Sequence, residues 1–260
     1  MNAPRPRVSG PLTADEIAAF HRDGYVLVRS FFQPDTAARL AAWASELAGR
    51  AEEPGRQMMY FEDSGSQPGR RLLNRIENFC PFHAGFDALL TGPGLRDAAA
   101  QLFGEPAVMF KDKINFKLPG GGGFTPHQDA QAGWDVYASL HTTALVSIDA
   151  ATRGNGCLEI VAGRHREGLL GPKWAPLPDE LVANLDFVPC ETAPGDVVFF
   201  DSYTPHRSDP NRSDCARRVL YVTYNRLAEG DQRQRYYADK RASYPPDCER
   251  DPGKRYVFRV

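Results

Sequence analysis

The sequence lacks three features that define large classes of protein. It has no apolar run approaching the roughly 20 residues that span a bilayer, and its first residues have no apolar core of a secretory signal. Its formal net charge is only -2. A chain so nearly neutral gives no electrostatic reason to expect nucleic acid or an anionic membrane as a partner. We therefore expect a cytoplasmic protein whose partner is a small molecule, with the oligomeric state, a homodimer included, left open.

The chain is also poor in cysteine. There are five cysteines, an odd number, and none has the C-x-x-C spacing of a zinc or redox motif: Cys80, Cys157, Cys190, Cys215 and Cys248. This pattern argues against a disulfide framework and against a zinc knuckle, so reduced thiols are expected.

What remains is an ordinary globular composition over 260 residues, with 42% hydrophobic and 25% charged residues. We expect a single domain spanning 1–260, with a flexible arm at 1–11 and a C-terminal tail at 228–260. The tail is charged and rich in tyrosine, and it either wraps the domain or forms a partner surface.

Two helical regions precede a series of strands. Thr13 and Glu16 form a capping box for a helix to about Phe20, Pro34 opens an amphipathic helix, and a further helix is predicted over 86–103. Strand-like segments lie at 25–28, 108–118, 139–148, 157–161, 186–188, 197–201 and 217–227. Helices followed by many short strands indicate a mainly β fold with flanking α, a sandwich or jelly roll with the N-terminal helices packed outside.

The segment 57–82 differs from both regions. It mixes clustered aromatic residues with charges and carries a Ser/Gly/Pro insert at 64–69. Long irregular segments in compact domains are commonly binding loops, so we predict a substrate loop here. The same aromatic residues could instead serve packing.

A glycine run, 120–123, stands directly before the motif His127-Gln-Asp129. Its flexibility suits a mobile lid. On extended backbone, side chains two residues apart point to the same face, which would place His127 beside Asp129. An imidazole and a carboxylate are two of the three ligands in the facial triad of non-haem Fe(II) sites.

A third ligand is predicted in the segment 194–206, where a turn and an apolar strand lead to a polar loop carrying His206. Arg217 follows eleven residues later at the start of a strand, where a guanidinium can hold a carboxylate in a two-pronged salt bridge. His141 is an alternative ligand. Arg217 could alternatively form a surface ion pair.

Together these motifs resemble the phytanoyl-CoA dioxygenase superfamily of Fe(II)/2-oxoglutarate oxygenases, over about residues 13–227. The resemblance implies a double-stranded β-helix (a jelly roll, cupin-like), with Fe(II) held by His127, Asp129 and His206. It also implies that O₂ is consumed and that Arg217 anchors the 2-oxoglutarate carboxylate, with the adjoining Arg218 as the alternative. Lys113 and Thr143 are predicted to contact the same cosubstrate.

Three further segments, 58–62, 73–79 and 110–117, are similar to bacterial organophosphonate hydroxylases, which act on 2-aminoethylphosphonate or its trimethylated analogue. The resemblance implies hydroxylation at the carbon next to phosphorus. We predict that substrate contacts come from five residues: Tyr60, Arg75, Glu77, Lys111 and Asn115. Cations and an amide suit a phosphonate, and a carboxylate or aromatic face suits an ammonium group.

Several of these residues could instead have a purely structural role. The lysine row of strand 108–118 would also fit a solvated strand face, and Arg75 and Glu77 could simply pair with each other. Two other functions remain open: the same chemistry on another amine, amino acid or natural product, and a non-catalytic metal- or ligand-binding jelly roll.

Overall fold

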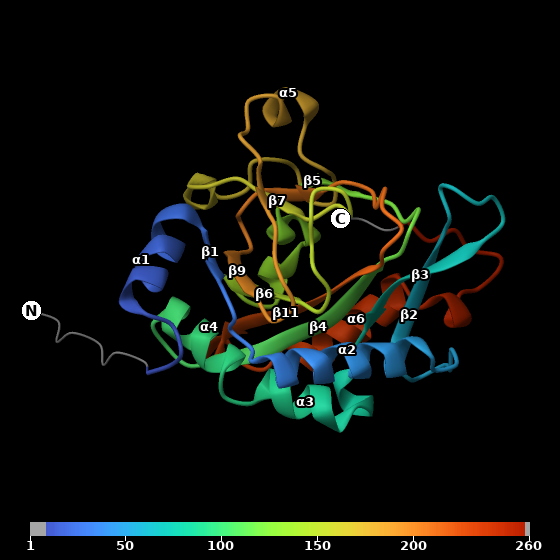
Figure 1. Cartoon of the computed structure of the whole chain (residues 1–260), viewed down its shortest axis with the longest axis horizontal. Helices are drawn as coiled ribbons and strands as arrows, with labels where there is room; N and C mark the ends of the chain where they lie inside the picture. The colour runs from blue at the N-terminus through green and yellow to red at the C-terminus, as the bar shows by residue number, and fades with distance from the viewer. Residues whose placement is uncertain (1–8, 258–260) are drawn as a thin grey trace, which may run out of the picture.

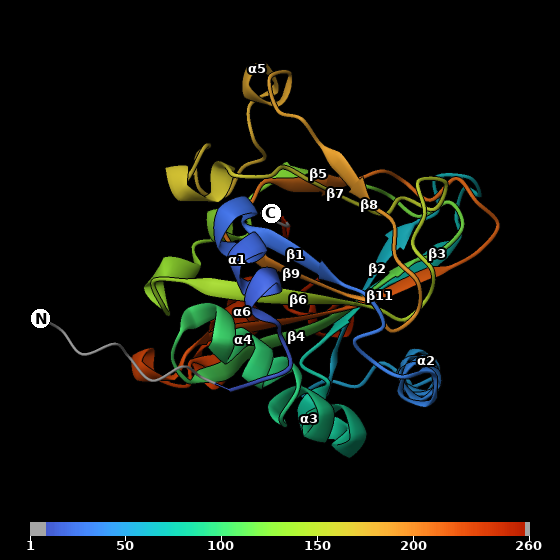
Figure 2. The ribbon, with the colours of Figure 1, turned by 60° about the vertical axis from the view of Figure 1, so that its left-hand side comes forward.

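Two antiparallel β-sheets face each other in the computed structural model, which describes residues 9–257 (Figures 1 and 2). The larger sheet has seven strands in the order β1-β9-β6-β11-β4-β3-β2, and the smaller has four in the order β5-β10-β7-β8. The strands are β1 (Tyr25–Val28), β2 (Met58–Asp63), β3 (Arg71–Glu77), β4 (Ala107–Lys117), β5 (Phe124–His127), β6 (His141–Ser147), β7 (Leu158–Ile160), β8 (Val188–Cys190), β9 (Val197–Asp201), β10 (His206–Ser208) and β11 (Arg217–Arg226). The expected double-stranded β-helix with flanking helices is confirmed.

Helices cover the outer face of the larger sheet, while α5 stands away from the body above the smaller sheet (Figure 1). The α-helices are α1 (Ala14–Asp23), α2 (Pro34–Ala48), α3 (Ala84–Thr91), α4 (Leu95–Phe103), α5 (Asp179–Val182) and α6 (Arg233–Ser243). Short 3-10 helices are η1 (Cys80–Phe82), η2 (Asp129–Ala132), η3 (Trp134–Val136), η4 (Arg164–Glu167), η5 (Leu227–Glu229) and η6 (Asp247–Glu249). The predicted capping box between Thr13 and Glu16 begins α1.

The alternation of β4 and β11 sorts their side chains between two cores. On β4, Ile114 and Phe116 pack under the helices, as Leu220 and Val222 of β11 do. The intervening positions of β11 face the smaller sheet, where Tyr221 packs in a separate cluster between the sheets. Because a strand alternates its side chains between two faces, one apolar set holds the helices and the other set is free to line the interior.

Two segments have a secondary structure different from the one predicted. Residues 57–82, expected to be an irregular loop, form the hairpin of β2 and β3 that extends the larger sheet beyond β4. The single helix expected over 86–103 is two helices, because Gly92, Pro93 and Gly94 interrupt it. Proline cannot continue a helix, and Gly94 has a positive φ of 100°.

The structure also specifies three segments that the sequence placed loosely: strand β8, the C-terminal tail and the N-terminal arm. Strand β8 begins at Val188, where the sequence indicated a strand over 186–188. The tail contains a helix, α6, which packs on β4, so of the two alternatives the tail wraps the domain. Of the predicted arm at 1–11, residues 1–8 lie outside the described residues, and 9–11 form neither helix nor strand.

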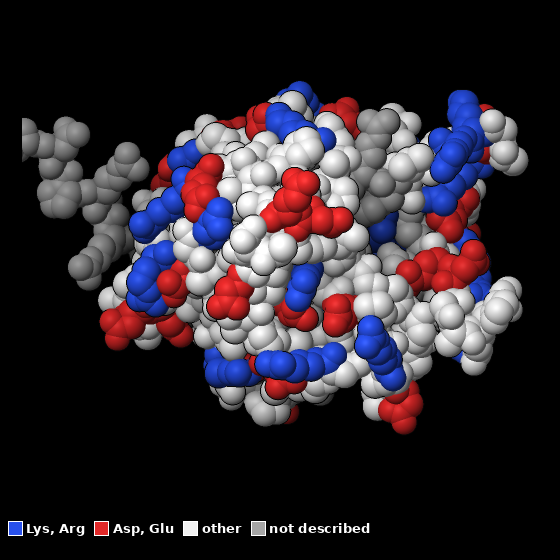
Figure 3. All heavy atoms as spheres, turned by 90° about the horizontal axis from the view of Figure 1, so that it is seen from above, with Lys and Arg blue, Asp and Glu red and all other residues white. Residues whose placement is uncertain are grey.

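The surface bears no dominant charge on the face seen in Figure 3, where acidic and basic side chains are interspersed. None of the helices within residues 9–257 has the length and apolar character needed to cross a bilayer. All five cysteines are unpaired.

Candidate metal centre and substrate pocket

Strand pairing brings the two predicted histidine ligands together. His127 ends β5 and lies opposite His206, the first residue of β10, and their ring centroids are 4.3 Å apart. Asp129 follows in the first position of η2, so it is not on a strand as the sequence suggested. Gln128 is still extended (φ -114°, ψ 135°), which keeps the side chains of His127 and Asp129 on the same side.

Each histidine is oriented by a backbone carbonyl two residues earlier. His127 Nδ1 lies 2.7 Å from the Thr125 oxygen and His206 Nδ1 lies 3.0 Å from the Thr204 oxygen. A carbonyl only accepts, so each Nδ1 carries the proton and each Nε2 is left with a lone pair. Both Nε2 atoms face Asp129 Oδ1, at 4.0 and 3.9 Å, and the three ligand atoms lie within 4.8 Å of one another.

The carboxylate is oriented as well. Thr143 Oγ1 donates a hydrogen bond to Asp129 Oδ2 at 3.1 Å, and it lies 3.0 Å from Thr223 Oγ1 on the neighbouring strand. Thr143 of β6 and Thr223 of β11 are register partners, which explains their contact. Outer hydrogen bonds of this kind fix the direction of a metal ligand and tune its affinity.

The protonation states suit a divalent cation. Burial lowers the pKa of His206, and burial together with the charge of His206 lowers the pKa of His127. Burial opposes ionisation of Asp129, but the two imidazoles, followed by Lys111 and Lys113, outweigh it and bring its pKa below the usual value. Two neutral imidazoles and one carboxylate are the forms that bind a metal without first losing protons.

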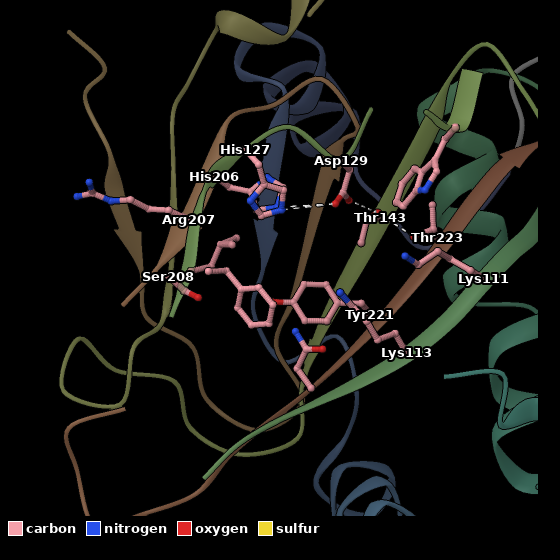
Figure 4. A pocket seen from close by; sticks show the side chains of 14 residues that line it. Lys111, Lys113, His127, Asp129, Thr143, His206, Arg207, Ser208, Tyr221 and Thr223 are labelled. Atoms are coloured by element: carbon pink, nitrogen blue, oxygen red, sulfur yellow. Dashed lines mark hydrogen bonds and ion pairs between the residues drawn. The ribbon is translucent and has the colours of Figure 1, made fainter. Parts of the chain in front are cut away.

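These ligands open on a small pocket between the sheets (Figure 4). Its volume is about 30 Å³, and it is lined by Lys111, Lys113, Asn115, Phe124, His127, Asp129, Trp134, Thr143, Leu158, His206, Arg207, Ser208, Tyr221 and Thr223. Figure 4 shows Asp129 pointing at the two histidines, Thr143 behind it, and Arg207 directed away from them. Arg207 pairs with Glu159 instead.

The two adjoining arginines have opposite environments. Arg217 is fully buried, and none of its three nitrogens makes a hydrogen bond of good geometry among residues 9–257; burial lowers its pKa, and the neighbouring Tyr221 opposes this shift. Arg218 lies on the other face of β11, where it forms a bidentate pair with Asp149. A buried guanidinium without a partner is costly, so Arg217 is the residue equipped to receive an anion.

A buried cluster of charges lies beside the metal pocket. Arg75 donates to Glu77 at 2.8 Å and Lys240 of α6 donates to the other oxygen at 2.5 Å. Lys111 and Lys113 add to the positive field on the same carboxylate. Burial raises the pKa of Glu77, but these four cations, led by Lys240 and Arg75, overcome it and lower the pKa. Four cations therefore surround one carboxylate.

The predicted substrate residues fall into two groups. Lys111 and Asn115 line the metal pocket, and so do Lys113 and Thr143 of the cosubstrate set. Tyr60, Arg75 and Glu77 do not line it. Arg75 and Glu77 form an ion pair, which was the alternative to a role in substrate binding. The lysines of β4 face the interior, so the alternative of a solvated strand face is wrong.

The alternative ligand His141 lies outside the metal group. It is buried against Phe110 and Trp134, with ring centroids at 4.5 and 5.3 Å. The glycine run, whose predicted role as a lid stays a prediction, is hydrogen-bonded to its neighbours: Gly120 N–H donates to Asn211 and its carbonyl accepts from Gly65.

Several residues of the metal pocket, and one of the charge cluster beside it, were not predicted. Tyr221 and Thr223 share a strand face with Arg217, so alternation along β11 could have found them. Trp134 lies in a 3-10 helix and Lys240 in the tail, where no periodic pattern points to the site.

Comparison with known proteins gives a consistent result. A family model described as phytanoyl-CoA dioxygenase matches residues 20–219. The chain is 43% identical over 249 residues to a 2-aminoethylphosphonate dioxygenase from uncultured bacterium HF130_AEPn_1, covering 94% of this chain and 93% of that protein. It is 41% identical over 236 residues to a methylphosphonate hydroxylase from Gimesia maris, covering 90% and 88%.

Among solved structures, EctD from S. alaskensis with 2-oxoglutarate and 5-hydroxyectoine superposes with a TM-score of 0.73. The two chains are 24% identical, and the match covers 85% of this chain and 78% of that one. At this identity the likeness concerns the fold.

Proposed function

The chain belongs to the phytanoyl-CoA dioxygenase family of Fe(II)/2-oxoglutarate-dependent dioxygenases, and from this we propose that it hydroxylates a small organophosphonate at the carbon next to phosphorus. The cofactor requirement follows from the family, whereas the substrate is our inference. The observation that carries the inference is the cluster of four cations around the buried carboxylate of Glu77, beside the metal pocket.

We assign the iron ligands to His127, Asp129 and His206. Two imidazole nitrogens with free lone pairs and one carboxylate oxygen, all within 4.8 Å, match the donor set that non-haem iron prefers. Thr143 keeps the carboxylate directed at the imidazoles through its hydrogen bond. A facial set of three ligands leaves the opposite positions accessible.

Arg217 is assigned to the distal carboxylate of 2-oxoglutarate. Its guanidinium is buried and makes no hydrogen bond of good geometry in the described chain, so a carboxylate would satisfy a group that otherwise bears a desolvation penalty. The planar fork of an arginine also matches a carboxylate in a two-pronged pair. Arg217 is not among the residues that line the metal pocket, whereas Lys113 and Thr143 are, on the strands β4 and β6 that flank its strand β11.

When bound, iron with 2-oxoglutarate and O₂ supplies the oxidising power that converts a C–H bond to C–OH, while 2-oxoglutarate becomes succinate and CO₂. The residues of this chain position the reactants. Phe124, Leu158 and Trp134 line the pocket with apolar surface that limits water around the reacting carbon. Lys111 and Asn115 offer donors to an anionic substrate group.

The charge balance favours a doubly anionic substrate group. Arg75 and Lys240 occupy the two oxygens of Glu77, and this leaves the ammonium groups of Lys111 and Lys113 without a direct carboxylate partner at hydrogen-bond distance in residues 9–257. Burial lowers the pKa of Lys113 to about 7 and also lowers that of Lys111. A phosphonate dianion would restore the charged form of both lysines and accept their hydrogen bonds.

Succinate release measures this proposal directly. Purified enzyme with Fe(II), 2-oxoglutarate and O₂ is offered methylphosphonate, 2-aminoethylphosphonate and matched amines and amino acids that lack phosphorus. We expect succinate in stoichiometric amount with hydroxylated product only from the phosphonates. If only the amines or amino acids were hydroxylated, the phosphonate assignment would be wrong and the alternative substrate class would be correct.

A pair of lysine variants tests the role of the charge. Lys113→Met should raise the KM for phosphonate by at least about tenfold, because one charge-assisted contact of about 1.5–3 kcal/mol is lost. Lys254→Met, at a lysine whose side chain is 70% exposed, is the matched control and should leave KM unchanged. Equal KM values for the two variants would show that Lys113 does not contribute to phosphonate binding.

A further inference from the structure

A second and much larger cavity adjoins the metal pocket. Its volume is about 580 Å³, and it is lined by Ala132, Gly133, Trp134, Val136, Tyr137, Trp174, Tyr236, Asp239, Lys240, Ser243, Tyr244, Arg255, Tyr256 and Val257. Small-molecule sites fall in the range of about 300–1,000 Å³, with aromatic walls and a few polar groups. The metal pocket, at about 30 Å³ by the same measure, is much the smaller of the two.

Trp134 is the residue that both linings share. Lys111, which lines the metal pocket, places its Nζ 4.5 Å from the centre of the Trp134 ring and 5.6 Å from that of Tyr236, a wall of the larger cavity. Lys240, another wall, is the partner of Glu77 in the charge cluster. Lys111, one of the two cations proposed for the phosphonate, therefore lies at the boundary between the two spaces.

The mouth of the larger cavity carries apolar side chains in contact with solvent. Val136, Trp174 and Val257 are 59%, 49% and 56% exposed. Trp174 also has a positive φ of 66°, which costs free energy in a residue other than glycine, and its ring lies where a Cβ on Gly133 would approach within 2.3 Å. Strained backbone and exposed aromatic surface together are typical of binding sites.

We propose that this larger cavity, called the antechamber below, holds the organic chain of the substrate beyond the carbon that is hydroxylated, and that Trp134 determines which chains fit. This rests on the proposed function and narrows it. The preferred substrates are phosphonates with a chain of two or more carbons, because methylphosphonate would leave the antechamber vacant.

The orientation of such a substrate follows from the charges. The phosphonate lies on Lys111 and Lys113, the adjoining carbon faces the iron ligands, and the remaining chain passes Trp134 into the antechamber. Tyr236 and Tyr137 offer it aromatic surface. Asp239 at the same wall accepts a hydrogen bond from Tyr137 at 2.8 Å and places one carboxylate near the end of the chain.

Rates with a chain-length series test the proposal. For the unmodified enzyme, kcat/KM for succinate release should rise from methylphosphonate to ethyl- and propylphosphonate by about fourfold for each methylene that becomes buried. Val136→Trp, at an exposed position of the mouth, would narrow the antechamber without changing the core. It should raise KM for propylphosphonate at least about tenfold and leave kcat and KM for methylphosphonate within twofold.

Trp134→Ala and the milder Trp134→Phe address the shared wall. Both should flatten the dependence of kcat/KM on chain length relative to the unmodified enzyme. The proposal would be overturned if Trp134→Phe and Val136→Trp lowered kcat/KM by the same factor for all chain lengths. It would also be overturned if the unmodified enzyme had the same kcat/KM for all chain lengths. Absence of turnover with every phosphonate would instead overturn the proposed function, so the two failures are distinguishable.

Fluorescence gives a readout independent of turnover. The chain has three tryptophans, and Trp43 packs in the outer layer against Phe86. In the anaerobic complex with Fe(II) and 2-oxoglutarate, a protein retaining only Trp134 (Trp43→Phe with Trp174→Phe) should change its emission on addition of propylphosphonate, and less with methylphosphonate. A protein retaining only Trp43 is the control. Equal responses of the two proteins would contradict the assignment.

Discussion

Replacing Arg217 with methionine should weaken cosubstrate binding and stabilise the protein without cosubstrate. The side chain is fully buried, and its three guanidinium nitrogens make no hydrogen bond of good geometry within residues 9–257; its polar neighbour is the neutral hydroxyl of Tyr221. A group selected for folding alone would be paired, because an unsatisfied buried polar group costs about 1–3 kcal/mol, and a charged group costs more. Methionine is flexible and apolar, so it can fill much of the same space without this cost.

The two effects have calculable sizes. Removing one partner of a buried charge pair costs about 3–5 kcal/mol, so the dissociation constant for 2-oxoglutarate should rise by about a hundredfold to a few thousandfold. The free energy of unfolding without cosubstrate should rise by about 1–3 kcal/mol. For a chain of this length each kcal/mol corresponds to about 2–4 °C in Tm, so a gain of several degrees is expected.

Thermal unfolding with and without 2-oxoglutarate measures both effects at once. At a cosubstrate concentration 100 times Kd, binding adds about 2.7 kcal/mol to the stability of the unmodified protein, or roughly 5–10 °C. The variant should start higher and show no such shift. Co(II) in place of iron avoids oxidation during the scan.

Arg218→Met is the matched control, because Arg218 pairs with Asp149 on the opposite face. It should lower Tm and keep the full shift with 2-oxoglutarate. If Arg217→Met retained the shift, or if Arg218→Met lost it, the assignment of the anchor would be wrong. If Arg217→Met lowered Tm without cosubstrate, the argument from the unpaired guanidinium would fail.

Three further predictions concern groups around the site. Thr143→Val should weaken Fe(II) binding by about ten- to a hundredfold in a chelator competition, while Thr142→Val, whose hydroxyl has no hydrogen-bond partner in the described chain, should not. Glu77→Gln should lower the free energy of unfolding by about 3–5 kcal/mol in urea, because buried cations lose their carboxylate; an unchanged midpoint would contradict this. Burial raises the pKa of Asp201 to about 6, above its unfolded value near 4, so the folded protein gains stability as the pH falls from about 6 to about 4. Asp201→Asn should therefore be more stable than the unmodified protein by up to about 3 kcal/mol at pH 8, with the difference vanishing towards pH 4 in denaturant titrations; a difference independent of pH would refute it.

Local sequence signals predicted much of this fold. Alternation along 108–118 placed Lys111, Lys113 and Asn115 on one face, and the structure turns that face inward. The capping box at Thr13 located α1. The motif at 127–129 and the loop ending at His206 converge as predicted, because antiparallel pairing of β5 with β10 sets the two histidines opposite each other.

The remaining features depend on contacts between distant segments. Segment 57–82 reads as irregular because its strands bury charged residues, such as Glu77, that a strand normally exposes. Their partner Lys240 is 163 residues away, and no short-range pattern can pair them. Alternation identified the face of Arg217 but not its lack of a partner, which requires coordinates.

The ion pair between β3 and α6 has a consequence for biosynthesis. Lys240 is synthesised 163 positions after Glu77, the carboxylate that it neutralises in the hairpin. Until α6 has been made and has docked, that hairpin holds an uncompensated buried charge or stays open to solvent. A product lacking α6 would therefore be a substrate for quality control instead of a weakly active enzyme.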